Sequence, residues 1–223
     1  VVGLPNPSDV TATEKRWQPS FRECLNDLAI DEVSLEWCER NPGLLMLSCE
    51  FERLLKVDRF LSDSLYNIHF SLLPAHKGAY PTTHAILKGD EEAGPTLHSI
   101  DSGIDTGPIV AKSPRPIRTD TTALDIYMDC QIDGRRLVRD NLKALLEGRV
   151  RTHSQPSKGS TFESRKSLDF SALRAINPKA SAEQVERQIR AANFRPYQLP
   201  TFAGATISGS SILETQSRQP CGT

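Results

Sequence analysis

Four short apolar runs, separated by glycine and proline, limit most strongly what this chain can fold into. They cover residues 44–49, 65–70, 95–100 and 107–112, and such bounded apolar runs are typical of β-strands. The first run is apolar nearly throughout, as in a strand that helices cover on both faces. The segment 81–88 between the runs can form a helix. The pattern therefore predicts an α/β fold in which helices flank an open, mostly parallel sheet.

Helices are predicted on both sides of these strands. The longest covers residues 121–147, where apolar side chains recur on one side, and Gly148 can end it. Another begins after Pro19, because proline suits the first turn of a helix. Further along, Ser181 and Gln184 form a capping-box pattern, which predicts a helix that begins at this point.

A polar stretch without apolar periodicity, residues 149–166, is expected to be a connector. We therefore predict a catalytic domain over residues 1–150 and a small C-terminal α+β domain over residues 151–212. Residues 213–223 are polar and are expected to form a flexible tail.

Charge and hydropathy exclude several classes of protein. The chain has 223 residues, with 27 Lys and Arg against 28 Asp and Glu, so it lacks the cationic surplus that non-specific binding to nucleic acid requires. No apolar run approaches the ~18 residues that would span a membrane. The apolar N-terminus, residues 1–5, is too short for a signal peptide. We expect a cytoplasmic protein that binds neither nucleic acid nor membrane.

Cysteine usage points to a reducing compartment. The five cysteines, at positions 24, 38, 49, 130 and 221, are odd in number and form no Cys-x-x-Cys pair, which argues against a disulfide framework and a thiolate zinc site. Cys24, Cys38 and Cys130 have apolar neighbours in predicted helices. We expect these three thiols to fill the core.

The polar chemistry gathers between residues 67 and 107. Asn67 and His69 are two residues apart in a predicted strand, so both side chains point to the same face. Asp105 lies between Gly103 and Gly107, which allow a sharp turn that would hold its carboxylate in place. In open α/β sheets the loops after the strands form ligand sites. An amide, an imidazole and a carboxylate could therefore converge here.

Such a trio suits attack by a neutral amine on a carbonyl carbon. Asn67 would donate a hydrogen bond to the developing oxyanion, His69 would manage the proton, and Asp105 would orient the imidazole or stabilise its cation. Taken singly, each residue has a simpler interpretation: a polar strand end for Asn67 and His69, and a turn former for Asp105. The other histidines of the segment, at positions 76, 84 and 98, are expected to be structural or exposed.

Competing chemistries find less support in the sequence. The histidine spacing includes no His-Glu-x-x-His, and we expect no metal site. The glycine patterns of dinucleotide and nucleoside-triphosphate sites are absent, as is the Gly-x-Ser-x-Gly elbow of hydrolases.

The segment 67–74, the glycine-containing stretches 77–78 and 87–98, and the run from Asp101 to Ile109 together resemble the catalytic core of the folate-dependent formyltransferases. The resemblance covers residues 44–112 and implies a Rossmann-like fold. It also implies that the matching Asn67, His69 and Asp105 transfer a formyl group from 10-formyltetrahydrofolate to an amine. By the same resemblance the pterin would contact Ser48, Cys49, Glu50 and Phe51, together with Asp101 and Gly103.

Two separate segments resemble the sugar N-formyltransferases within this family. These are residues 76–81 and residues 190–200. The resemblance implies a dTDP-linked amino sugar as acceptor, nearest to dTDP-4-amino-4,6-dideoxyglucose, and we expect a homodimer. A dTDP-3-amino sugar, glycinamide ribonucleotide, or a non-catalytic nucleotide-sugar binder are the alternatives.

A dTDP ligand would need a flat partner for thymine and cations for the pyrophosphate. Tyr80 and Tyr197 are candidates for the first role, and Lys77 and Arg195 for the second. Equally, the tyrosines could be packing rings and the cations solvated charges.

The chain departs from the family pattern at its start. Family members have a strand-helix unit before the segment that matches residues 1–4, and this unit is expected to be absent here. Either the chain begins late or is trimmed, or it tolerates a reduced sheet with weakened folate binding.

Overall fold

The computed structural model describes residues 1–9, 19–194, 198–202 and 205–206. The chain divides into two compact units, each built from separate stretches of sequence. The first unit comprises residues 1–69, 96–112 and 134–159, and the second comprises the remainder. The division into domains at residue 150 stays a prediction.

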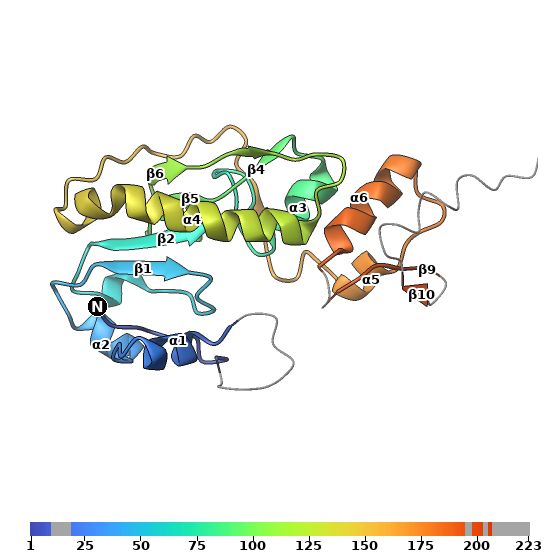
Figure 1. Cartoon of the computed structure of the whole chain (residues 1–223). Helices are drawn as coiled ribbons and strands as arrows, with labels where there is room; N and C mark the ends of the chain where they lie inside the picture. The colour runs from blue at the N-terminus through green and yellow to red at the C-terminus, as the bar shows by residue number, and fades with distance from the viewer. Residues whose placement is uncertain (10–18, 195–197, 203–204, 207–223) are drawn as a thin grey trace, which may run out of the picture. The chain divides into compact units, whose positions relative to one another are not determined.

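The first unit contains a four-stranded sheet in the order β1, β2, β5, β6 (Figure 1). The strands are β1 (Met46–Cys49), β2 (Leu65–His69), β5 (Thr96–Ser99) and β6 (Ile109–Lys112). They lie within the four runs that the sequence predicts. The fold is therefore α/β with an open sheet flanked by helices.

The sheet is mixed, so the prediction of a mostly parallel sheet was wrong. Strand β1 pairs with β2 in parallel, whereas β2 with β5 and β5 with β6 are antiparallel. Thr96, the first residue of β5, lies opposite His69, the last residue of β2. The segment 70–95 therefore leaves the sheet at the end of β2 and re-enters it beside that same end. The short loop 100–108 likewise turns the chain straight back, and such tight connections join antiparallel strands.

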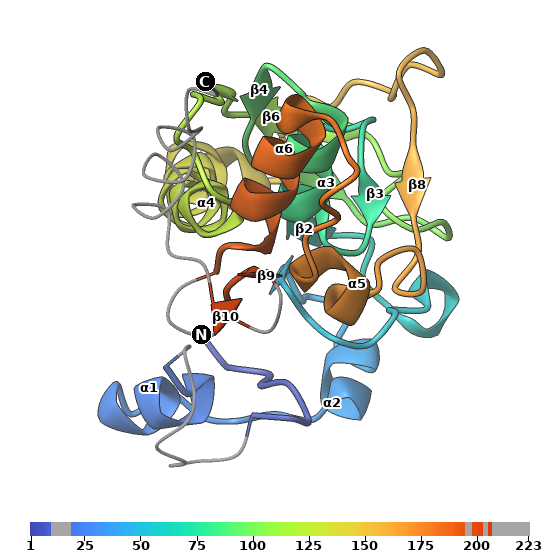
Figure 2. The ribbon, with the colours of Figure 1, turned by 90° about the vertical axis from the view of Figure 1, so that its right-hand side faces the viewer.

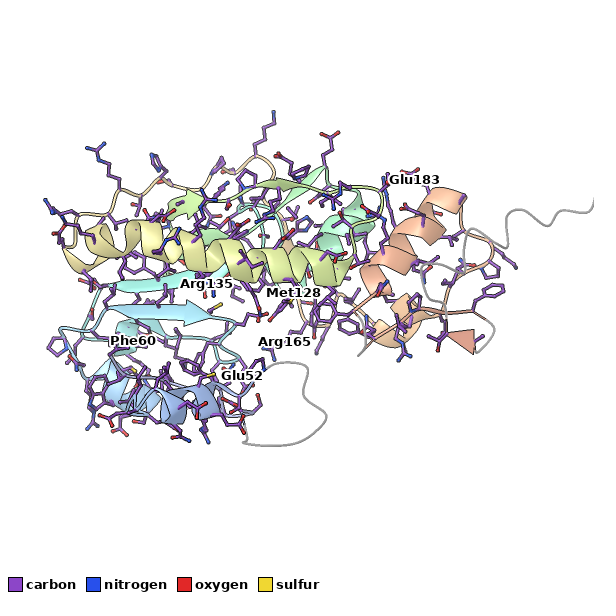
Figure 3. The ribbon with its side chains drawn as sticks, viewed as in Figure 1. Glu52, Phe60, Met128, Arg135, Arg165 and Glu183 are labelled. Atoms are coloured by element: carbon purple, nitrogen blue, oxygen red, sulfur yellow. The ribbon has the colours of Figure 1, made fainter. Side chains whose placement is uncertain are left out.

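A hydrophobic cluster supports β1 on one face. Cys38, Met46, Phe60 and Leu65 are its buried members, and Figure 3 marks Phe60. Two helices with serine N-caps, α1 (Phe21–Asp27) and α2 (Leu35–Glu39), precede β1 in the sequence, and a 3-10 helix spans Val57–Arg59 between β1 and β2. The cluster anchors the strand that ends beside the candidate site.

Two details of packing differ from the sequence predictions. Leu47 is 42% exposed while Met46 and Ser48 are buried, so β1 is covered on one face and not on both. Within the described sheet β1 is also an edge strand. Cys24 is also exposed, because Leu25 takes the buried position of α1; Cys38 and Cys130 are buried as predicted.

The second unit is built from helices and two-stranded ribbons. Its elements are α3 (Pro81–Lys88), α5 (Phe170–Arg174) and α6 (Ala182–Ala192), with the ribbons β3 (Lys77–Gly78) and β8 (Phe162–Glu163), β4 (Glu92–Ala93) and β7 (Arg115–Pro116), and β9 (Thr201–Phe202) and β10 (Ala205–Thr206). Helix α3 packs against α6 (Figure 2). The long helix α4 (Ala123–Leu146) begins in this unit and continues into the first.

The helix signals of the sequence are confirmed. Helix α4 ends before Gly148, which adopts a φ of +63°. The capping box of Ser181 and Gln184 forms at the start of α6. Nowhere in the described ranges is a helix both long and apolar enough to cross a membrane.

Candidate active site

The site is built on the end of β2. Asn67 and His69 share one face of this strand, because strand side chains alternate. His69 is buried at 7% exposure and Asn67 is half-buried. The strand lies inside the sheet, paired on both sides, so it holds both side chains on a rigid support.

The loop 100–108, between β5 and β6, brings the carboxylate of Asp105. The Asp101 carboxylate accepts hydrogen bonds from the Gly103 amide at 3.1 Å and from the Thr106 hydroxyl at 2.6 Å. Gly107 lies so close to β5 that a Cβ there would meet the Ser99 carbonyl oxygen at 1.8 Å. The loop is thus folded tightly back on its own strand.

The structure brings the three side chains together. His69 Nδ1 lies 3.5 Å from Asp105 Oδ2, and Asn67 Nδ2 donates to Asp105 Oδ1 at 3.4 Å. The side chain of Asp105 is 14% exposed and that of His69 is 8% exposed. Because little water reaches the pair, the charge of Asp105 acts on the imidazole more strongly than it would at the surface.

His98 is a fourth member of the group, although its sequence context predicts only a structural or exposed histidine. It faces Asn67 across the antiparallel β2 and β5 pair and is 2% exposed. Its Nδ1 lies 2.8 Å from the Ser99 carbonyl, so this nitrogen carries the proton in the neutral ring. Nε2 is then an acceptor for the Asn67 amide at 3.3 Å, and it lies 3.6 Å from Asp105 Oδ1.

The contact with Asp105 explains how the Asn67 amide is oriented. The Asp105 carboxylate, 3.4 Å from Asn67 Nδ2, only accepts hydrogen bonds and so could not pair with the amide oxygen. The NH2 group therefore points toward His98 and Asp105. An antiparallel pairing of β2 with β5 would have placed His98 opposite Asn67, but the sequence pattern predicts mostly parallel strands.

The segment expected to contact the pterin lies at the same sheet edge. Ser48 pairs with Asn67 and Cys49 with Ile68 in the parallel register, so β1 and β2 end together. Asn6 holds the loop that follows: its Nδ2 donates to the Glu50 carbonyl at 3.1 Å. Asn6 Oδ1 also accepts from the Glu52 amide at 2.9 Å, and Figure 3 marks Glu52. Glu50 itself has a φ of +52°.

The candidate nucleotide contacts are placed in part. Lys77 and Tyr80 belong to the second unit, where Lys77 Nζ donates to Ser160 Oγ at 3.0 Å. The Tyr80 ring packs edge-on against Phe170, with ring centres 4.8 Å apart, and stays 37% exposed. Arg195 and Tyr197 lie outside the described residues. In the described part of the chain, no group of three or more His, Cys, Asp and Glu side chains could hold a metal ion.

Comparisons with known proteins agree on one family. The profile of the family described as formyl transferase matches residues 32–139. The methionyl-tRNA formyltransferase of Halorhodospira halophila is 38% identical over 138 residues, which are 62% of this chain and 43% of that protein. The chain thus spans less than half the length of the curated relatives it matches.

Solved structures extend the similarity over most of the chain. A sugar 3N-formyl transferase, WlaRD, solved with dTDP and 5-N-formyl-THF, has a TM-score of 0.86 and 33% identity, covering 92% of this chain and 74% of that one. The N-formyltransferase of Helicobacter canadensis, in complex with folinic acid and dTDP-3-aminofucose, has a TM-score of 0.85 and 33% identity, covering 91% and 74%. A 4-N formyltransferase from Francisella tularensis is similar in fold, at a TM-score of 0.66 and 20% identity, covering 84% and 79%.

Proposed function

Because the chain belongs to the formyl transferase family, we propose that it transfers a formyl group from 10-formyltetrahydrofolate to the amine of a dTDP-linked amino sugar. The observation that carries this proposal is the meeting of Asn67, His69 and Asp105, with contacts of 3.4 and 3.5 Å, at one sheet edge. The folate, as formyl donor, would supply the carbonyl carbon that the amine attacks. The new C–N bond to the amine would form, the bond between the formyl carbon and N10 would break, and the proton that His69 accepts would pass to N10 of the leaving tetrahydrofolate.

Each side chain has a distinct role in this proposal. His69 directs Nδ1 toward Asp105, which leaves Nε2 to accept the proton of the attacking amine. Asp105 then stabilises the imidazolium that forms. Asn67 donates a hydrogen bond to the developing negative charge on the formyl oxygen. Its contacts with Asp105 and His98, at 3.4 and 3.3 Å, are both long, so a modest rotation of the planar amide would let one N–H reach the formyl oxygen.

His98 supports the same step. Its Nε2 lies 3.3 Å from Asn67 Nδ2 and would limit rotation of the amide beside the reacting carbonyl. The contacts of Ser48, Cys49, Glu50 and Phe51 with the pterin, and those of Asp101 and Gly103, remain part of the proposal, as do the nucleotide contacts of Lys77 and Tyr80. Register supports the first group, because β1 and β2 end at the same edge.

The position of the acceptor amine is the finer question. Sequence resemblance favours a 4-amino sugar, nearest to dTDP-4-amino-4,6-dideoxyglucose. The two solved structures at 33% identity are a sugar 3N-formyl transferase and an enzyme complexed with dTDP-3-aminofucose, which favours the 3-amino alternative. We propose a dTDP-amino sugar of either kind, since the described side chains act on the amine and the carbonyl and not on the sugar ring.

The test is an acceptor screen. The purified protein is incubated with 10-formyltetrahydrofolate and, separately, with a dTDP-3-amino sugar, a dTDP-4-amino sugar and glycinamide ribonucleotide, and products are identified by mass spectrometry. Formylation of one dTDP-sugar is the expected result. Formylation of glycinamide ribonucleotide alone would overturn the choice of acceptor. If calorimetry shows that a dTDP-sugar binds but folate does not, and no product forms, the protein is a nucleotide-sugar binder and not an enzyme.

A further inference from the structure

Residues 149–166 are predicted to be a polar connector, but their first part, residues 149–159, belongs to the first unit and makes specific contacts there. His153 forms a backbone bridge with Ile109 at the start of β6, through two hydrogen bonds of 2.8 Å. This bridge carries the chain past the end of the loop 100–108. The next side chain but one, Gln155, therefore lies beside that loop.

Gln155 donates hydrogen bonds to the backbone on both sides of Thr106. Its Nε2 donates to the carbonyl oxygen of Asp105 at 2.8 Å and to that of Gly107 at 2.8 Å. Both amide hydrogens are thus used, while Oε1 is buried and has no hydrogen-bond partner in the described part of the chain. The opposite orientation would set Oε1 against two carbonyl oxygens, so the donors must face the loop.

One of the two carbonyls that Gln155 binds belongs to Asp105, whose backbone conformation is unusual for a residue other than glycine. Asp105 has a φ of +53°, in the left-handed region that most residues other than glycine, asparagine and aspartate avoid. Such a conformation persists where the surroundings over-determine it. Asp101 and Gly107 fix the loop toward its own strand, and Gln155 fixes the two carbonyls from the other side.

We propose that Gln155 is a positioning residue for formyl transfer, which acts by holding Asp105 in the conformation that aims its carboxylate at His69. This inference rests on the proposed function. Gln155 reaches the reaction through the backbone of Asp105, whose Oδ2 lies 3.5 Å from His69 Nδ1. Small displacements of such a group are costly, because a misplacement of about 1 Å can reduce a rate about 100-fold.

The chain offers a matched control in Gln188 of α6. Its Nε2 also grips backbone carbonyls, those of Leu173 at 2.8 Å and Ala175 at 3.0 Å, within the second unit. Gln155→Met and Gln188→Met each remove the amide donors and keep the side-chain volume. We expect the two variants to lose similar thermal stability, and kcat to fall roughly 10- to 100-fold in Gln155→Met alone. The KM for both substrates should stay within about threefold, because no substrate contact is removed.

Gln155→Glu sharpens the comparison. A carboxylate has nearly the same shape but only acceptors, so it would repel both carbonyls. We expect its kcat to be as low as that of Gln155→Met or lower. A wild-type kcat in Gln155→Glu would overturn the proposal.

A double variant separates positioning from a general structural effect. If Gln155 acts through Asp105, then Gln155→Met should cause a smaller loss of kcat when added to Asp105→Asn than when added to the wild type, because the group it positions has lost most of its attraction for His69. Losses that multiply in the double variant would overturn the proposal.

Hydrogen exchange tests the grip without any turnover. Amides of residues 101–107 should exchange faster in Gln155→Met than in the wild type and be unchanged in Gln188→Met. Unchanged exchange in Gln155→Met would overturn the inference. Failure of the wild type to formylate any amine would instead overturn the proposed function, and the exchange result would still decide whether Gln155 holds the loop.

Discussion

Asp105→Asn tests how much the carboxylate charge contributes to formyl transfer. Asparagine keeps the shape of the side chain and tolerates the left-handed φ of +53° at this position. The substitution therefore removes the negative charge with little change to the backbone. At 3.5 Å and an effective dielectric constant of about 20, a carboxylate and an imidazolium attract by roughly 5 kcal/mol.

Part of that attraction survives the substitution, because the amide oxygen can still accept a hydrogen bond from His69 Nδ1. We therefore expect a loss of about 2.7–4 kcal/mol in the transition state, which lowers kcat about 100- to 1000-fold. The assay is steady-state formylation with saturating donor and acceptor, accompanied by thermal unfolding of each variant.

Asp133→Asn is the matched control. Asp133 is also a buried carboxylate with a cationic partner: Arg115 Nε lies 2.5 Å and Nη2 2.8 Å from its two oxygens. Its loss should lower the melting temperature and leave kcat unchanged. A folded Asp105→Asn protein that retains kcat within tenfold of the wild type would refute the assigned role of the charge.

Three further predictions concern other residues. Asn67→Ala should reduce kcat about 100- to 1000-fold, as the loss of one oxyanion donor does, with product formation as the assay; near-normal turnover would contradict its role. Gly107→Ala should destabilise the protein by about 1–3 kcal/mol in urea unfolding, because the new Cβ would meet the Ser99 carbonyl oxygen at 1.8 Å; an unchanged free energy of unfolding would show that the loop yields freely. Burial lowers the pKa of His84 from its ordinary 6.5, so the unfolded state binds the proton more readily and stability should fall as the pH drops below about 6.5. His84→Asn should flatten that part of the profile, and equal pH slopes in both proteins would argue against the assignment.

Local signals in the sequence identified most of the elements. Helix α3 occupies the predicted residues, and α6 begins at its predicted capping box. The direction of β5 could not be read in the same way, because apolar runs look alike in parallel and antiparallel strands. It depends on where the segment 70–95 re-enters the sheet, with Thr96 opposite His69.

In the candidate site, too, local sequence patterns indicate some residues, whereas others depend on contacts between distant segments. The spacing of Asn67 and His69 places them on one face of a strand, and the glycines around Asp105 indicate a turn, so local pattern suffices to nominate all three. His98 and Gln155 gave no such signal. His98 reaches Asn67 through an antiparallel pairing of strands. Gln155 donates to backbone carbonyls 48 and 50 positions away, and because every residue has a backbone carbonyl, the sequence does not mark these two as its partners.

A crystal structure with 5-formyltetrahydrofolate and dTDP bound would test the central claim most directly. We expect the formyl oxygen to lie about 2.7–3.1 Å from Asn67 Nδ2, with His69 Nε2 facing the side from which the amine attacks. A formyl group bound beyond the reach of both side chains, with Asn67 still donating to Asp105, would contradict it.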